Sequence, residues 1–392
     1  MNYILYDGVW REHLLPFTFT RPVSEIRVGI TTIREKWESL LEERVSFLTR
    51  PYLQRKFPLH EDKDSIIIEA SVLPNESLVA EIQALQPGEA LIRDEQTIAV
   101  RPASFNRDTD PFGSGYRPVS SGADFKTLRY PWEIFKFNPE IIREDFKRLT
   151  AGRKSLPVPE NVMVSGDKEL VFIEEGADLK HAYINTEAGP VYIGKNAKVM
   201  EGAIIRGPFA LCEHATVKMG AKIYEGTTVG PWSKVGGEVN NSVIFGYSSK
   251  AHDGYMGNSV LGEWCNLGAD TNTSNLKNTY ESIKVWSYAE NRFVNTGEQF
   301  CGLLMGDHSK SGINTMFNTG TVVGVFCNIY GAGFQRNFIP SFSWGGTQGF
   351  KLYNLKRAFN VAEAVMKRRN RQLDEADRDM LTYLHEHSVI RA

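Results

Sequence analysis

The sequence has few cysteines, no long apolar run and no excess of one charge. Its cysteines show no C-x-x-C pair, so neither a zinc ribbon nor a disulfide framework is expected: Cys212, Cys265, Cys301 and Cys327. Thiols of this kind favour a reducing compartment, and we expect a cytoplasmic protein. No apolar stretch approaches ~18 residues, so we expect no membrane-spanning helix. The first seven residues also lack the basic and apolar regions of a signal peptide.

A net charge of −2 gives no basic field of the kind that nucleic-acid partners require. Hydrophobic residues make up 42% of the chain, which is ordinary for a globular protein. The length of 392 residues leaves room for two or three domains.

A six-residue repeat organises the second half of the chain. Aliphatic residues recur every sixth position: Ile193, Val199, Ile205, Leu211, Val217, Ile223, Val229 and Val235. Two positions before each stands a mostly smaller residue: Val191, Ala197, Ala203, Phe209, Ala215, Ala221, Thr227 and Ser233. A helix cannot keep this period on one face. A solenoid with flat sides and tight corners can, since each aliphatic residue points inward and each corner closes on a small one.

The period returns at Met305, Ser311, Phe317, Val323 and Ile329, and at Leu261 and Leu267. We therefore expect a solenoid over 171–346. Two interruptions, between Val235 and Leu261 and around 272–302, are expected to be extruded loops of the kind that build binding faces. Amphipathic segments over 352–367 and 374–387 predict C-terminal helices, within 347–392, that cap the open end.

This repeat resembles that of the hexapeptide-repeat acyltransferases. The resemblance implies a left-handed parallel β-helix, an acyl-CoA cosubstrate and a homotrimer with sites between subunits. We expect outward aromatic residues to supply interface area: Trp232, Tyr247, Trp264 and Phe326.

Residues 1–130 alternate strand and helix patterns, which predicts an α/β domain. Strands are expected at 3–6, 45–48 and 65–69, helices at 31–43 and 78–85, and a hairpin over 90–100. Ligands of open α/β sheets bind beyond the carboxyl ends of strands. Arg21 and Arg27 fall in the segment after the first strand, where they would bind phosphate or, alternatively, pair with Glu25 and Glu35 on the surface.

Asp7, Thr20-Arg21-Pro22, Arg27 and Thr32 to Trp37 resemble a divergent sugar nucleotidyltransferase domain fused to hexapeptide repeats in a bacterial family. That family is related to the bifunctional enzyme that acetylates glucosamine-1-phosphate and then uridylylates it. The resemblance implies Asp7, Arg21, Arg27 and Lys36 as nucleotide-binding residues, with Mg²⁺ assisting.

The Gly-rich phosphate loop of ordinary nucleotidyltransferases is replaced by Asp7-Gly8-Val9-Trp10-Arg11-Glu12. The metal ligands are not identified, although Asp108-Thr109-Asp110 has metal-like spacing in a polar loop. The domain is therefore either an active nucleotidyltransferase or a degenerate nucleotide-sugar binder. Residues 131–170 are expected to form a helical linker.

The segment after Val235 resembles the acetyl-transfer motif of the same bifunctional enzyme. That motif is Lys-Ala-x-His-x-x-Tyr-x-Gly with an Asn fourteen residues after the His, and His252, Tyr255 and Asn266 keep its spacing. An amine loses a proton as it attacks a thioester, and imidazole is a base suited to neutral pH. The resemblance therefore implies His252 as the catalytic base. It implies substrate-binding roles for Tyr255, Asn266, Asn275, Lys218 and Lys250.

Several features leave this assignment open. A lone His in a Gly-rich loop is otherwise a surface residue. Leu276 replaces a family tyrosine, Lys218 replaces an arginine, and Asn240 replaces a lysine. A zinc site like that of solenoid carbonic anhydrases is not expected, because the histidines are isolated. In relatives the later coils line the arm of CoA, which implies Ser309, Lys310 and Ser311 as acetyl-CoA contacts, or else plain corner residues.

Three hypotheses follow from these residues. The first is a sugar-1-phosphate nucleotidyltransferase fused to an acetyl-CoA-dependent amino-sugar-phosphate N-acetyltransferase, in a pathway of the UDP-N-acetylglucosamine type. Its partners would be a sugar phosphate, a nucleoside triphosphate and acetyl-CoA. The second is an acetyltransferase whose N-terminal domain only binds nucleotide-sugar. The third is a solenoid scaffold without activity.

Overall fold

The computed structural model describes residues 1–62, 64–107 and 109–388. The chain forms two compact units. The first comprises residues 1–14, 20–26 and 31–130, and the second comprises 15–19, 27–30 and the chain from Pro131 onward. The 131–170 segment predicted as a linker is thus part of the second unit.

The first unit is built on one six-stranded sheet, as the α/β prediction requires. The strand order is β2-β1-β3-β5-β4-β6. Strands β1 (Asn2–Tyr6), β2 (Val45–Leu48) and β3 (Ser65–Glu69) run parallel, and β5 (Gln96–Arg101) is antiparallel to β3 and to β4 (Glu89–Arg93). Strand β6 (Arg117–Ser120) pairs parallel with β4 at the edge.

The helices of this unit begin where the sequence offers caps. Helix α1 (Ile33–Leu41) starts with a capping box between Thr32 and Glu35, and α3 (Glu76–Gln83) starts with the Asn75 side chain. Both caps satisfy backbone N–H groups of the first turn. Shorter helices are α2 (Pro51–Gln54), η1 (Glu12–Leu14) and η3 (Val23–Glu25).

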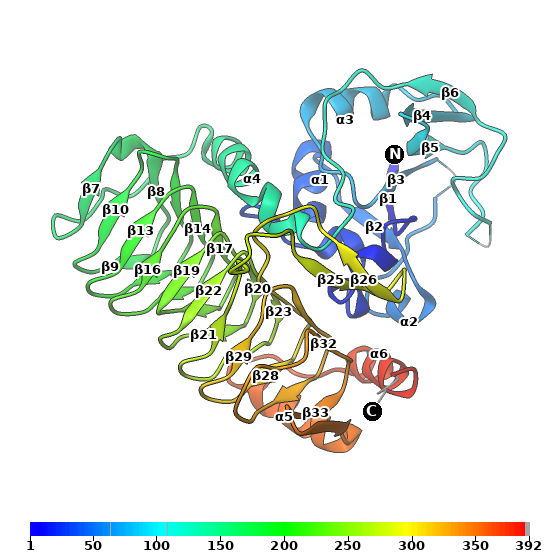
Figure 1. Cartoon of the computed structure of the whole chain (residues 1–392). Helices are drawn as coiled ribbons and strands as arrows, with labels where there is room; N and C mark the ends of the chain where they lie inside the picture. Colours follow the sequence, from blue (N-terminus) through cyan, green and yellow to red (C-terminus); the bar gives the residue numbers. More distant parts are fainter. Residues whose placement is uncertain (63, 108, 389–392) are drawn as a thin grey trace. The chain divides into compact units, whose positions relative to one another are not determined.

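The second unit is a parallel β-solenoid whose strands stack in three ladders (Figure 1). The β7–β22 ladder contains β7 (Met163–Ser165), β10 (Tyr183–Asn185), β13 (Ile204–Arg206), β16 (Lys222–Ile223), β19 (Glu238–Asn240) and β22 (Tyr255–Gly257). The β9–β21 ladder contains β9 (Asp178–Leu179), β12 (Lys198–Val199), β15 (Thr216–Val217), β18 (Lys234–Val235) and β21 (Ser249–Lys250). The β8–β32 ladder contains β8 (Val171–Ile173), β11 (Val191–Ile193), β14 (Phe209–Leu211), β17 (Thr227–Val229), β20 (Val243–Gly246), β23 (Val260–Glu263), β27 (Leu303–Met305), β30 (Thr321–Val323) and β32 (Phe338–Ile339).

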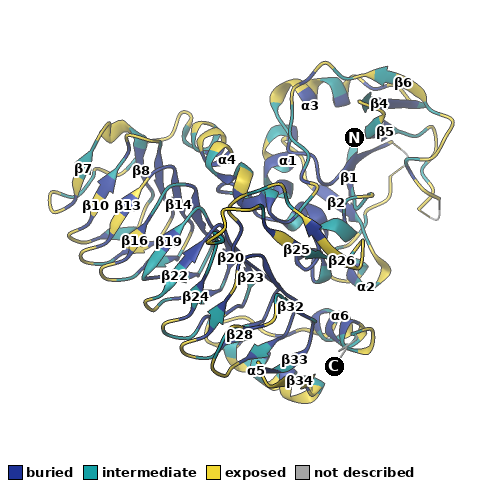
Figure 2. Ribbon diagram, viewed as in Figure 1, coloured by how far each residue is buried: buried dark blue, intermediate teal, exposed yellow. Residues whose placement is uncertain are grey.

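Later coils continue the pattern in shorter sheets. One pairs β24 (Asn272–Thr273) with β29 (Met316–Phe317), and the other orders β28 (Lys310–Ser311), β31 (Asn328–Ile329), β33 (Ser343–Gly346) and β34 (Gly349–Leu352). All eight repeat aliphatics from Ile193 to Val235 are at most 2% exposed, and so are the smaller residues two positions before them. Figure 2 shows buried residues along the ladders and exposed residues at the turns. The repeat therefore predicted the core of the solenoid correctly.

The first interruption of the repeat is not an extruded loop, contrary to the prediction. Strands β19 to β22 continue the three ladders, with Val239, Ile244, Lys250 and Met256 in the buried column. The spacing departs from six only because the corners here differ in length. The second interruption does leave the coil, as the antiparallel hairpin of β25 (Lys284–Ser287) and β26 (Arg292–Asn295).

The aromatic residues expected on the outside instead stack along one corner of the solenoid. Tyr247 and Trp264 lie 4.2 Å apart between ring centroids, and His308 and Phe326 lie 4.3 Å apart. Trp264 is 7% and Phe326 3% exposed. The prediction that these side chains supply interface area is therefore wrong for Trp264 and Phe326, because the next coil covers each ring.

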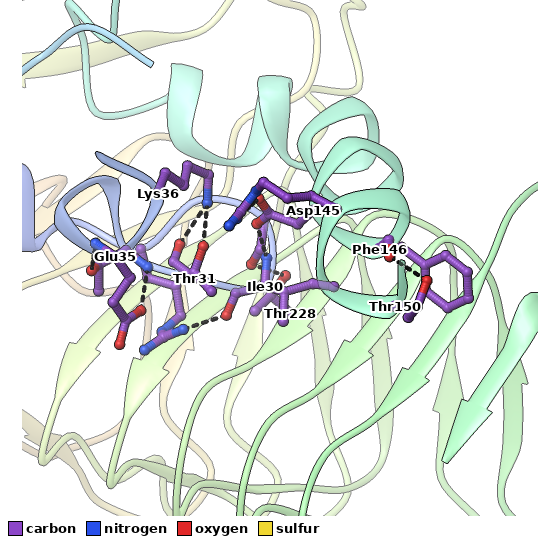
Figure 3. A network of polar contacts seen from close by, with 12 residues as sticks. Ile30, Thr31, Glu35, Lys36, Asp145, Phe146, Thr150 and Thr228 are labelled. Atoms are coloured by element: carbon purple, nitrogen blue, oxygen red, sulfur yellow. Dashed lines mark hydrogen bonds and ion pairs between the residues drawn. The ribbon is translucent and has the colours of Figure 1, made fainter. Parts of the chain in front are cut away.

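Helix α4 (Glu133–Thr150) packs on the solenoid together with a strap formed by residues 27–30. The Asn138 amide accepts from Gly29 N at 2.6 Å and donates to Gly226 O at 2.7 Å. Asp145 Oδ2 accepts from Ile30 N at 2.8 Å, and Thr228 donates to Gly29 O at 2.9 Å (Figure 3). Because the strap adds no strand, these side chains satisfy its buried backbone groups.

Two helices, α5 (Leu355–Lys367) and α6 (Glu375–Glu386), follow the last strands, as predicted. Apolar residues of both are buried: Ala358, Ala362, Met366, Met380, Leu381 and Leu384. In the part of the chain that the structure describes, no helix has the length and apolar character needed to cross a membrane.

Candidate functional sites

The carboxyl ends of β1 and β3 form the candidate nucleotide site of the first unit. The chain continues from β1 to β2 on one side of β1 and to β3 on the other, so the strand order reverses here. Crevices at such points bind ligands in open α/β sheets. Asp7 directly follows β1, and Glu69 ends β3. Gly8 lies against Glu69, because a Cβ at position 8 would overlap the Glu69 carboxylate.

The Asp7 carboxylate is already held by three protein groups. It accepts from Val23 N at 2.8 Å and from Thr49 Oγ1 at 2.5 Å, and Arg11 Nε lies 3.3 Å away. Burial raises the pKa of Asp7, while Arg11 opposes that rise. Asp7 thus has little capacity left for a ligand.

Glu69 is a functional candidate that the sequence reasoning missed. It is 2% exposed, and its Oε1 accepts from the Ser71 hydroxyl at 3.0 Å. Burial raises the pKa of Glu69 to about 7, and the nearby Asp7 charge adds to the rise. A glutamate closing the apolar strand Ile66-Ile67-Ile68 is the signal that would have identified it.

These carboxylates do not fit a resident Mg²⁺ ion, because Asp7 is fully engaged by protein donors. Among the described residues, no group of three or more His, Cys, Asp or Glu side chains converges as metal ligands would. Asp108 lies outside the described residues, and Asp110 accepts a hydrogen bond from the Tyr6 hydroxyl at 3.3 Å. We therefore derive no metal-assisted step.

The predicted basic residues are buried rather than displayed at this edge. Lys36 is 4% exposed, and its ammonium donates to Thr31 O and Thr31 Oγ1 at 2.9 Å each. Arg21 is 5% exposed. Burial raises the pKa of Glu25, and the charge of Arg21 opposes that rise. Arg27 packs within the solenoid unit, where it donates to Phe245 O at 3.0 Å and to Ile30 O. The contacts of Lys36 and Arg27 are structural.

In the solenoid unit, His252 lies exposed in the corner between β21 and β22. Lys218 stands on the same row of corners. Gly236 lies between the coil that carries Lys218 and the coil that carries His252. A Cβ at Gly236 would meet Ala251 O on one side and lie 3.2 Å from Lys218 Cβ on the other. The corner thus presents an imidazole, with a lysine about two strand spacings away, roughly 10 Å.

Lys250 does not face this corner, although it was predicted to bind substrate. Its position pairs with the inward Val235, and it is 2% exposed. Its Nζ donates to the carbonyl of His252 at 2.7 Å. Burial lowers the pKa of Lys250 to about 8, although Asp253 and Asp270 oppose the shift. The substrate-binding assignment is wrong, because the strand register turns this side chain inward.

Tyr255 and Asn275 are brought together, as candidates for one site should be. Asn275 Nδ2 donates to Tyr255 Oη at 3.1 Å and to Asn258 Oδ1 at 2.8 Å. Burial raises the pKa of Tyr255, so the phenol stays protonated and keeps its proton for a ligand. Gly257 makes room for this contact, since a Cβ there would overlap the phenol oxygen and lie 2.6 Å from Asn275 Nδ2.

Asn266 is exposed and bridges Ser249 and Lys310 through its backbone. Its side chain therefore lies on the outer face of the β21 coil, available to a ligand.

Lys218 lies among other cations. Burial lowers the pKa of Lys234, and the charges of Arg369, Lys218 and Arg368 add to that effect.

The three residues predicted to contact acetyl-CoA serve the coil instead. Ser309 is fully buried, donates to Gly324 O at 2.7 Å and accepts from Cys327 N at 2.9 Å. Ser311 shares a hydrogen bond with Thr271 at 2.9 Å. Lys310 donates to His308 O at 2.9 Å, and burial lowers the pKa of its ammonium to about 8. These contacts contradict the predicted coenzyme roles of Ser309 and Ser311.

Comparisons with known proteins match different parts of the chain, and the family-model match extends past Tyr130 through α4, which belongs to the second unit. Residues 3–154 match a family model described as sugar nucleotidyl transferase. The bifunctional protein GlmU of Methanocaldococcus jannaschii is 34% identical over 197 residues, which is 50% of this chain and 41% of that protein. The bifunctional sugar-1-phosphate nucleotidylyltransferase/acetyltransferase of Sulfurisphaera tokodaii is 30% identical over 144 residues, covering 36% of this chain and 35% of that protein.

The chain thus spans less than half the length of these two relatives. An uncharacterized acetyltransferase of Escherichia coli, YaiX, is 27% identical over 49% of this chain and 76% of its own. Among solved structures, the polysialic-acid-specific acetyltransferase NeuO has a TM-score of 0.28 at 16% identity, over 49% of this chain and 86% of its own. A TM-score this low carries no argument about the fold, which is established instead by the strand ladders described above.

Proposed function

We propose that the chain is a bifunctional transferase that makes a nucleotide-sugar of the UDP-N-acetylglucosamine type. The solenoid unit would transfer an acetyl group from acetyl-CoA to an amino-sugar phosphate. The N-terminal unit would join a sugar-1-phosphate to a nucleoside triphosphate. The observation that carries the acetyl-transfer proposal is the exposed His252, three residues before a tyrosine that is hydrogen-bonded to Asn275. The names of the relatives supply the substrate classes.

The residues of the corner suit amide formation. The amine nitrogen attacks the thioester carbonyl, the N–C bond forms, and the C–S bond breaks to release the CoA thiol. His252 would take the proton that the amine loses, as a general base, and would pass it to the departing sulfur, so that CoA leaves as the thiol. The Tyr255 hydroxyl and the exposed Asn266 amide would donate to sugar hydroxyls or to the developing oxyanion.

A second candidate for the N-terminal unit is nucleotide-sugar binding without transfer. The observation that favours it is the engagement of Asp7 by Val23, Thr49 and Arg11, in a chain without the Gly-rich loop. In either case Glu69, which ends β3, would be the nearest carboxyl to the ligand that does not share the protein donors of Asp7.

The acetyl-transfer proposal is tested by thiol release from acetyl-CoA with glucosamine 1-phosphate. His252→Ala is expected to lower the rate by about 10²- to 10⁴-fold while leaving the melting temperature unchanged. Full activity in this variant would remove His252 from the mechanism. Absence of thiol release with any amino-sugar phosphate would favour the scaffold hypothesis.

The N-terminal proposal is tested separately, by pyrophosphate release from UTP or dTTP with a sugar-1-phosphate and Mg²⁺. Release by the intact protein would support transfer. Saturable binding of UDP-N-acetylglucosamine without release would support the binding candidate.

We further propose a cytoplasmic location, since both cosubstrates are metabolites of that compartment and the cysteines are free thiols.

A further inference from the structure

A cavity of about 330 Å³ lies beside the extruded hairpin of the solenoid unit. Its lining combines two lysines, one aromatic ring and three hydrogen-bonding side chains: Lys277, Lys284, Phe293, Asn318, Thr319 and Asn337. This volume is within the range of small-molecule sites, roughly 300–1,000 Å³. The cavity also follows directly on the candidate acetyl-transfer residues, because Lys277 is two residues after Asn275.

The hairpin that carries Lys284 is fixed on the coils. Its flanking residues Ile283 and Val285 are fully buried, and Trp286 stacks on Phe338 with ring centroids 4.4 Å apart. Gly320, at φ +63°, lets the Lys284 carbonyl approach, since a Cβ at 320 would lie 2.5 Å from that oxygen. The backbone at Lys284 is thus fixed by packing, so the strand that carries this side chain does not have to be ordered when a ligand binds.

The charge of the cavity is positive. Lys277 Nζ forms an ion pair with the Glu281 carboxylate at 3.7 Å and donates a hydrogen bond to Ser282 O at 3.1 Å. Lys284 is exposed, and among the described residues no carboxylate lies within ion-pair distance of it. The cavity therefore offers one uncompensated ammonium and a second that is partly compensated.

Neutral donors complete the lining. Asn318 Oδ1 accepts from Thr319 N at 2.8 Å, which leaves the Asn318 amide nitrogen for a ligand. Asn337 Nδ2 donates to Thr319 O at 2.8 Å, which holds that side chain at the wall. Two cations with amide and hydroxyl donors match the oxygens of a phosphate group, and the partly exposed Phe293 ring suits the carbon face of a sugar or base.

We propose that this cavity is a binding site for a phosphate monoester, with Lys284 as its principal cation. The phosphate would belong either to a sugar phosphate or to the 3′-phosphate end of a coenzyme. The site is distinct from the Lys218 cations, which lie on the corner row of His252. Only the choice between the two phosphate sources rests on the proposed function.

The test is isothermal titration of the full chain with three probes: inorganic phosphate, glucosamine 1-phosphate and adenosine 3′,5′-bisphosphate. Lys284→Met is expected to weaken binding of the preferred monoester by about tenfold, since it removes one charge-assisted hydrogen bond. Lys351→Met, an exposed lysine on β34, is the matched control and should leave the dissociation constant unchanged. Binding should also weaken as salt is raised.

Asn337→Asp places a negative charge in the wall and should weaken binding at least as much, with melting temperatures showing that both variants are folded. Tighter binding of the amino-sugar phosphate assigns the cavity to an acceptor, and tighter binding of the bisphosphate assigns it to a coenzyme. Failure of all three probes to bind at millimolar concentration, or equal binding by both variants, overturns the proposal. Lys284-dependent binding in a protein that releases no thiol would support this site while the proposed acetyl transfer fails.

Discussion

Lys250 stands in the inward column of the β9–β21 ladder, where the equivalent residues of the earlier coils are valine or leucine. Below pH 8 it is charged in a buried site, while the unfolded chain holds its proton up to about pH 10.5. The folded state therefore binds fewer protons between these values, and stability rises with pH across that window. Lys250→Met removes this penalty but also the hydrogen bond to His252 O. We expect a net gain of about 1–2 kcal/mol at pH 7 that disappears near pH 10.

Urea unfolding at pH 7 and pH 10 measures the effect, and Lys198→Met, at an exposed position of β12, should show neither the gain nor its pH dependence. A variant less stable than the parent at pH 7 would mean that the hydrogen bond to His252 O outweighs the buried charge.

Gly257 is the residue that permits the contact between Tyr255 and Asn275. Its φ lies outside the left-handed region, so an alanine there meets only the steric conflict with these two side chains. Gly257→Ala should separate them and cost about 1–3 kcal/mol in stability. If the pair binds the acceptor, KM for glucosamine 1-phosphate should rise more than kcat falls.

Gly246→Ala is the matched control, because the nearest atom to its added Cβ lies 3.5 Å away. An unchanged KM in a folded Gly257→Ala variant would remove Tyr255 and Asn275 from the acceptor site.

Motif spacing predicted which residues of this region come together but not which way they point. His252 is exposed, and Tyr255 meets Asn275, as a site requires. Lys250 lies in the same motif as His252, and Ser311 lies in the segment predicted to contact acetyl-CoA. The strand register nevertheless turns both side chains inward. A side chain's direction in a solenoid follows from corner length, and corners of unequal length leave no trace in the local motif. Glu69 was missed for a related reason: its raised pKa arises from burial beside Asp7, which only the sheet order produces.

At the scale of elements, the strap of residues 27–30 is the feature that sequence patterns could not reveal. Its residues look like a loop after the first strand, where Arg27 is expected either to bind phosphate or to pair with a surface carboxylate. Their partners lie more than one hundred residues away on α4 and β17, so no local pattern encodes them. The strands and the inward column, by contrast, follow from a period that each coil repeats.

Asn138 is the residue of α4 on which this strap depends most. It is fully buried and pairs with Gly29 N and Gly226 O. Asn138→Ala would leave both backbone groups unsatisfied, at a cost of about 2–4 kcal/mol. Thermal unfolding measures the loss, and Lys147→Ala, exposed on the same helix, should change little. A loss equal to that of Lys147→Ala would mean that water satisfies the strap.

At the scale of the whole molecule, we predict a homotrimer formed through the outer face of the β7–β22 ladder. Met163, Tyr183 and Ile204 stand in register on this face at 64%, 39% and 48% exposure. Met219, on an adjoining corner, is 63% exposed. An apolar row of this kind on three-sided coils is typical of a surface that another subunit covers.

Sedimentation should return three times 44.2 kDa. Ile204→Glu would place a charge in the centre of the interface and should dissociate the trimer. Leu352→Glu, which is also 48% exposed but lies on β34, should not. Because Tyr255 belongs to the same ladder and His252 to the corner before it, a site completed by a neighbouring subunit would lose acetyl transfer on dissociation while nucleotide binding by the N-terminal unit persists. A monomeric Ile204→Glu protein with full thiol release would show that each chain carries a complete acetyl-transfer site.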